Sequence, residues 1–146
     1  MILSEYDEFC DATALNTGAA GTYNVGDIID TNNDGINLAD DLWLVIRVAT
    51  TATSGGSATG QFRLVSDATT SISTTTATVH VTSAAFAVAA MTAGVTLLAV
   101  KLPKDTYERY LGIQQITGTA AFTAGAIDAF LTNDIDAWKA FPDGVN

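Results

Sequence analysis

The feature that most constrains the fold is the segment 42–48, whose apolar side chains fall on both alternating faces. The even-numbered positions are all aliphatic, and the odd-numbered positions carry Trp43, Val45 and Arg47. Branched and aromatic residues that alternate with a period of two favour a β-strand. Because both faces are mostly apolar, we predict a strand in the interior of a sheet rather than at its edge.

Shorter apolar alternations recur along the chain, and Gly, Asn, Asp and Ser separate them. We predict strands over 10–15, 23–30, 42–48, 61–66, 76–83, 96–102, 109–117 and 124–131. About eight strands at hairpin-like spacing favour an all-β, two-sheet jelly-roll sandwich with little helix. A length of 146 residues suits one domain, 1–146, with 132–146 as an extended C-terminal tail.

Alternation also assigns the chemistry-bearing side chains of the segment 76–83. It predicts that Val79 and Val81 point inward and that His80, the single histidine, lies exposed on a Thr-lined face. A Ser-His-Asp triad requires a buried histidine beside an activated serine, so this interpretation argues against a hydrolase. We expect no enzymatic activity.

The single cysteine, Cys10, excludes an internal disulfide. Alternation places Cys10, Ala12 and Ala14 inward. The surrounding acidic residues disfavour a thiolate, so we interpret Cys10 as a small core residue rather than a nucleophile.

The balance of charge limits the partners. Sixteen acidic and six basic residues give a net charge of −10. Nucleic acid and anionic lipid both require basic residues to replace counterions, so we predict binding to neither. The acidic start differs from the basic start of a signal peptide, so we do not expect secretion by that route. The single cysteine fits folding in a reducing cytoplasm. The uncharged stretch 84–100 is rich in Ala, Thr and Gly, and we interpret it as buried strands rather than a membrane span.

One acidic loop resembles the start of an EF-hand. Its oxygen ligands for a Ca²⁺ ion would come from Asp30, Asn32, Asp34, the Ile36 carbonyl and Asp41. An EF-hand needs a flanking helix, but the residues that follow predict a strand. We therefore prefer an Asn/Asp/Gly turn, with no metal and no cofactor, and keep a Ca²⁺-dependent dockerin-like or lectin-like module as an alternative.

Several segments, in order along nearly the whole chain, resemble the jelly-roll capsid cement proteins of podophages. They are 1–3 (MIL), 9–12 (FCDA), 42–46 (LWLVI), 102–103 (LP), 109–112 (RYLG), 122–132 (FTAGAIDAFLT) and 136–143 (DAWKAFPD). The resemblance implies a non-enzymatic cement (decoration) protein on the outer capsid surface of the virion. It also implies a homo-oligomer that ties major capsid protein subunits together. A tail or head-fibre domain is a second alternative.

Apolar residues near both ends of the chain are our candidates for interfaces. They are Met1, Ile2, Leu3, Trp138, Phe141 and Pro142. The last three lie in a segment too short to form a core of its own, and aromatic anchors are concentrated at protein interfaces. We expect a homodimer, with a trimer as the second choice.

Overall fold

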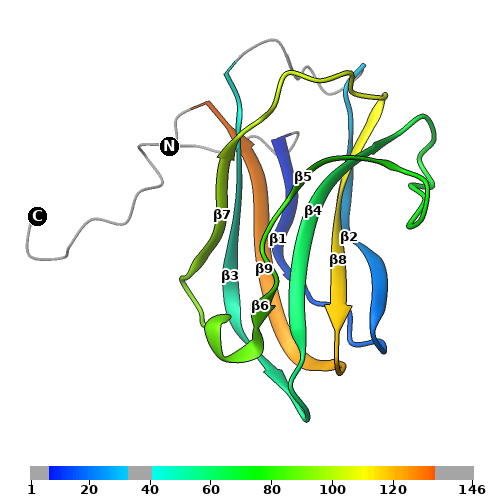
Figure 1. Cartoon of the computed structure of the whole chain (residues 1–146). Helices are drawn as coiled ribbons and strands as arrows, with labels where there is room; N and C mark the ends of the chain where they lie inside the picture. Colours follow the sequence, from blue (N-terminus) through cyan, green and yellow to red (C-terminus); the bar gives the residue numbers. More distant parts are fainter. Residues whose placement is uncertain (1–6, 33–40, 134–146) are drawn as a thin grey trace, which may run out of the picture.

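The computed structural model describes residues 7–32 and 41–133, which form two antiparallel sheets that face each other (Figure 1). The strands are β1 (Glu8–Ala14), β2 (Gly21–Asp30), β3 (Trp43–Ser54), β4 (Thr59–Asp67), β5 (Thr78–Thr82), β6 (Phe86–Ala87), β7 (Thr96–Lys101), β8 (Tyr110–Gly118) and β9 (Phe122–Thr132). A single turn of 3-10 helix, η2 (Val88–Ala90), follows β6. No helix of these described ranges is long and apolar enough to cross a membrane.

The strand order confirms the predicted jelly roll. One sheet, which we call sheet A, runs β1-β9-β3-β7, and the other, sheet B, runs β2-β8-β4-β5, with the two-residue β6 paired to β4. Successive strands therefore alternate between the sheets except at β4, β5 and β6, which all lie in sheet B, as expected for two nested Greek keys. The predicted interior strand is β3, which lies between β9 and β7.

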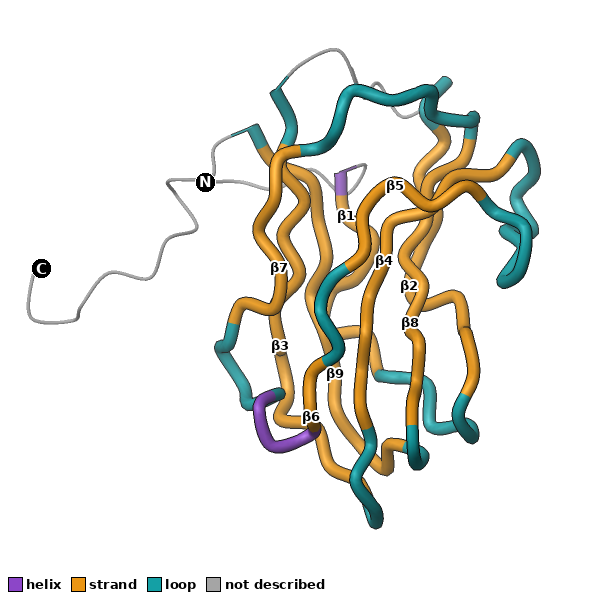
Figure 2. The backbone as a smooth tube through the Cα atoms, viewed as in Figure 1, coloured by secondary structure: helices purple, strands orange, loops and turns teal. Residues whose placement is uncertain are grey.

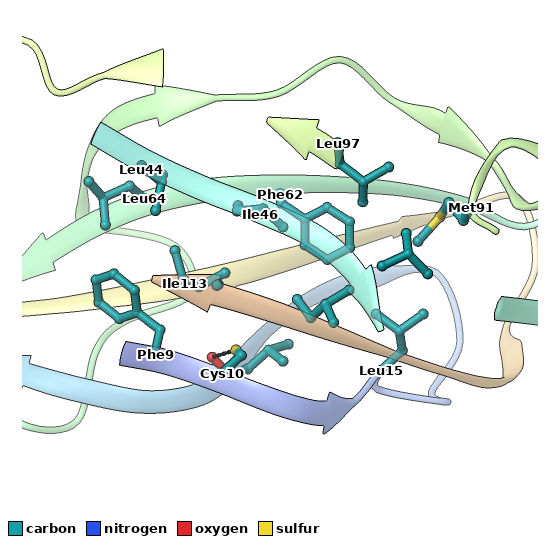
Figure 3. Packing of buried hydrophobic residues seen from close by; sticks show 14 of the residues in the cluster. Phe9, Cys10, Leu15, Leu44, Ile46, Phe62, Leu64, Met91, Leu97 and Ile113 are labelled. Carbon is teal, nitrogen blue, oxygen red and sulfur yellow. Dashed lines mark hydrogen bonds between the residues drawn. The ribbon is translucent and has the colours of Figure 1, made fainter. Parts of the chain in front are cut away.

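The core fills the space between the inward faces of the two sheets (Figure 3). The inward residues of β3 predicted by alternation, Leu44, Ile46 and Val48, are fully buried. Ile127, Ala129 and Leu131 of β9 are buried beside them, also as predicted. Long-range antiparallel pairing of apolar strands thus holds the sandwich together.

Alternation was wrong in β1. Cys10 is buried, but Ala12 and Ala14 are exposed, and Phe9 and Leu15 fill the core instead. The pairing of β1 with β9 shifts register twice, and Ala12 adopts a left-handed backbone with φ of 46°. A β-bulge adds a residue to one strand and reverses the facing of those that follow.

The segments between strands also differ from expectation. The strands predicted over 42–48 and 61–66 are longer than expected, because β3 continues to Ser54 and β4 begins at Thr59. The Thr/Ser-rich segment 68–77 forms a loop (Figure 2). The stretch 84–100, expected to form buried strands, contains β6, η2 and most of β7, and only Met91 and Leu97 within it are buried.

Candidate functional site

The side chain of the single histidine is buried, so the prediction that it is exposed was wrong. The pairing of β5 with β4 shifts register between Leu64 and Val65, which places a β-bulge beside His80. The bulge leaves the His80 side chain 0% exposed and Val79, predicted to point inward, 41% exposed. A period of two cannot be carried across an extra residue, and nothing in the local sequence marks the bulge.

His80 joins two side chains in the order of a Ser-His-Asp triad. Its Nε2 lies 2.7 Å from the Oγ of Ser66 on β4, and its Nδ1 lies 2.8 Å from the Oδ2 of Asp105. Asp105 belongs to the connection from β7 to β8, which crosses between the sheets at one end of the sandwich (Figure 1). Three elements distant in sequence therefore meet at one imidazole, which we call the His80 relay.

The acceptor at one end sets the direction of one hydrogen bond in the relay. The Asp105 carboxylate can only accept, so Nδ1 of His80 donates to it. Nε2 of His80 is hydrogen-bonded to the Ser66 hydroxyl, whose oxygen also accepts from the Glu108 amide at 3.1 Å. The His80 hydrogen bond is the main reason that the pKa of Asp105 is lowered.

The relay is closed to a substrate. Ser66 is 0% exposed, and its oxygen is already occupied by a backbone amide. The Tyr107 ring lies 4.2 Å from the imidazole, centroid to centroid, and its hydroxyl donates to the Pro103 carbonyl. Burial is also the main cause of the raised pKa of Tyr107. A nucleophilic serine must reach a carbonyl carbon, and the buried Ser66 hydroxyl cannot. We therefore interpret the relay as a structural hydrogen-bond network that holds β4, β5 and this connection together.

A second polar network holds the loop 68–77 over the outward face of sheet B. Three side chains from adjacent strands bind three successive loop carbonyls. Asn24 of β2 donates to Ile72 at 2.7 Å, Gln114 of β8 to Ser73 at 2.9 Å, and Arg63 of β4 to Thr74 at 3.3 Å. Gln114 also bonds to Asn24 and Arg63, which makes the row continuous across the sheet. We call these three side chains the polar row.

The two described acidic residues of the predicted Ca²⁺ loop are engaged by cations. Both Asp30 oxygens accept from Arg109 at 2.9 Å, and this bond is the main reason that the pKa of Arg109 is raised. Asp41 pairs with Lys101 at 3.0 Å. The described residues contain no group of three or more His, Cys, Asp or Glu side chains that could hold a metal ion. Asp34 and Ile36 lie outside the described residues.

The other predicted features fall into two groups. Cys10 is buried as expected, and burial raises the pKa of its thiol to about 12, so it is a poor nucleophile. The interface candidates Met1, Ile2, Leu3, Trp138, Phe141 and Pro142 lie outside the described residues, and that assignment stays a prediction.

One open hollow of about 330 Å³ lies beside β1 and β2. It is lined by 13–17 and 24–26, which contribute no titratable side chain. General acid–base chemistry has no titratable group to act with in this lining.

The fold and these sites together define a jelly-roll protein whose hydrogen-bond networks hold its own loops against the strands. Residues 9–131 match the model of the Bbp16 family, so the chain belongs to that family. This family is phage-related. No curated protein matches the chain.

Proposed function

We propose that this protein is a non-enzymatic capsid cement protein. It binds the outer surface of the expanded phage head as a homodimer and bridges neighbouring major capsid protein subunits. The observation that carries the proposal is membership of a phage-related family by a jelly-roll chain. The resemblance of the ordered segments to podophage cement proteins specifies the role.

The surface chemistry supports an outward position. A net charge of −10 disfavours contact with packaged DNA, because polyphosphate binding depends on basic residues. Three of the basic side chains are already paired with carboxylates: Arg47 with Asp128, Lys101 with Asp41, and Arg109 with Asp30. A capsid exterior faces bulk solvent, where a net negative charge keeps particles apart.

The mechanism we propose is selective binding of one capsid state. A site that spans adjacent subunits exists only after the shell expands, so occupancy stabilises the expanded lattice by mass action. Many modest contacts repeated over the lattice then resist internal pressure. Within this scheme the aromatic tail, with Trp138, Phe141 and Pro142, contacts the major capsid protein.

Co-sedimentation tests the proposal. Purified protein is mixed with empty expanded capsids or with unexpanded procapsids, each with and without a Ca²⁺ chelator. We expect saturable binding to expanded capsids alone, unchanged by chelator. Binding to neither shell would contradict the cement role, and loss of binding with chelator would favour the Ca²⁺-dependent alternative.

A serine-reactive probe tests the non-enzymatic part. Because the Ser66 hydroxyl is sealed, a fluorophosphonate should not label the native protein, and Ser66→Ala should leave capsid binding unchanged. Labelling that disappears in Ser66→Ala would show that the relay opens to reagents. That result would favour the hydrolase interpretation.

A further inference from the structure

One end of the sandwich is built, among the described residues, without any charged side chain. Four connections meet there, at the lower end in Figure 1: β1 to β2, β3 to β4, β6 to β7 and β8 to β9. They belong to four stretches of sequence that contain no Asp, Glu, Lys or Arg, namely 12–26, 48–62, 68–100 and 110–127. We use the name uncharged end for the residues of these connections, which are 15–20, 55–58, 88–95 and 119–121.

The opposite end is charged. The connection from β7 to β8, residues 102–109, carries four charged side chains. Asp30 and Asp67 lie beside it, since both pair with Tyr110 at the start of β8. The remaining described charges lie on the strands or at this same end. The charge of the described residues is therefore concentrated away from the uncharged end.

The uncharged end presents apolar side chains to solvent. Val95 is 37% exposed, and Val88 is half-buried. The other exposed apolar side chains of this end are Ala19, Ala20, Ala89, Ala90 and Ala93. Apolar surface that gathers in one region of an otherwise strongly charged protein is typical of a protein contact. This end is therefore the part of the described surface best suited to a partner of low charge.

Charge selects the partner. Two copies of this chain each carry a net charge of −10, so they repel each other wherever their acidic surfaces meet. A two-fold symmetric contact brings the same surface of both copies together, so that surface must be compatible with itself. The uncharged end meets this condition, and the acidic surface does not. A protein of different sequence is able to bring basic residues to the acidic surface instead.

We propose that two copies of this protein associate through their uncharged ends. This inference rests on the proposed homodimer and assigns its contact surface. The arrangement places the charged ends of the two copies farthest apart, and it leaves them accessible to the capsid. Because the uncharged end contributes no ion pair, salt should strengthen the dimer by screening the repulsion between the two acidic molecules.

Paired charge substitutions test the contact in the full chain. Ser57 and Ala90 are exposed residues of the uncharged end. Ser57→Glu with Ala90→Glu should raise the dissociation constant of the dimer by about tenfold or more in sedimentation equilibrium, because like charges then meet. Ser57→Lys with Ala90→Lys should weaken the dimer similarly, although it lowers the net negative charge. An equimolar mixture of the two variants should recover dimers, because opposite charges then meet.

Ala68→Glu with Ser71→Glu is the matched control, since it makes the same exchanges at exposed positions in the loop 68–77. It should dimerise with nearly native affinity, and circular dichroism checks the folding of every variant. A native protein that stays monomeric, or a native dimer that salt dissociates, would overturn the proposal. Native affinity in both the Glu and the Lys variants, or no recovery in their mixture, would do the same.

Capsid binding separates this contact from the cement role. Native dimers that salt strengthens but that bind no expanded capsid would contradict the cement role and still support the contact. A Ser57→Glu, Ala90→Glu variant that stays dimeric but no longer binds expanded capsids would assign the uncharged end to the major capsid protein. That outcome would overturn the assignment to a second copy.

Discussion

The two outward faces of the sandwich are both partly buried, but different chemistry covers them. On sheet B the polar row bonds to the carbonyls of the loop 68–77, and Ile72 packs beneath that loop. On sheet A the outward side chains are mainly apolar, and we call Trp43, Val45, Phe130 and Thr132 the outer seat. Hydrogen bonds fix which backbone atoms meet, whereas apolar burial contributes free energy with little directional preference. The comparison teaches that a two-layer fold can gain a third layer by either route.

The largest expected effect is from Phe130→Ala. A fully buried phenylalanine replaced by alanine costs about 3–5 kcal/mol of unfolding free energy, even though Phe130 lies on an outward face. The matched control, Val79→Ala, should change the unfolding free energy by less than about 0.5 kcal/mol, since Val79 is largely solvated. Urea unfolding measures both. A loss below about 1 kcal/mol for Phe130→Ala would show that the outer seat is open in solution.

The cover of sheet B should respond next, through Ile72 and Gly112. A Cβ added at Gly112 would lie 2.5 Å from the Ile72 Cδ1, so Gly112→Ala displaces that side chain. We expect a loss of about 2 kcal/mol from Gly112→Ala and a similar loss from Ile72→Ala. Because Ile72→Ala removes the clashing atom, the double variant should lose much less than the sum. Additive losses in urea unfolding would mean that the two residues do not meet.

Sequence reasoning recovered the parts of this fold that depend on regular alternation. A period of two correctly predicted the interior position of β3 and the inward residues of β9. The number of predicted strands correctly indicated two sheets. The facing of Ala12, Ala14, Val79 and His80 failed, because bulges in β1 and beside β5 break that period. The His80 relay joins Ser66, His80 and Asp105 through tertiary pairing, which no local pattern contains.

The outer seat also shows what alternation can and cannot predict. Trp43 and Val45 gave the second apolar face of segment 42–48, and that face predicted an interior strand. The structure bears this out within the sheet, but the second face points out of the sandwich rather than into a core. A pattern of apolar residues on both faces therefore indicates cover on both sides without naming what supplies it.

A smaller effect is expected from Gln114→Leu, which removes the centre of the polar row. Gln114 is fully buried, and its amide donates to Asn24 and Ser73 while its oxygen accepts from Arg63. Unpaired buried groups cost free energy, so we expect a loss of about 1–2 kcal/mol. Hydrogen exchange should speed up in the loop 68–77 and remain unchanged beside the outer seat. Gln61→Leu, which removes one bond from a half-buried side chain, is the control.

The smallest effect, a pH dependence of opposite sign on the two faces, completes the comparison. Asp67 closes the loop on sheet B by accepting from the Ser73 and Thr69 amides, and the Ser73 bond is the main cause of its lowered pKa. A lowered folded-state pKa stabilises the fold above the unfolded value of 3.8, and that contribution is lost as the pH falls through the folded value.

Asp7, which precedes β1 of sheet A, behaves in the opposite way. Burial raises its pKa, so its charge disfavours the fold at neutral pH, and acid relieves that cost as the pH falls through the raised value towards 3.8. As the pH falls below 3.8, the Ser73 amide resonance should report loosening of the loop, with Asp67→Asn removing the response. Above 3.8, as the pH falls through the raised pKa of Asp7, the free energy of unfolding should gain a contribution that Asp7→Asn abolishes, measured by urea unfolding. The same pH response in the native chain and in Asp7→Asn would contradict the raised pKa of Asp7.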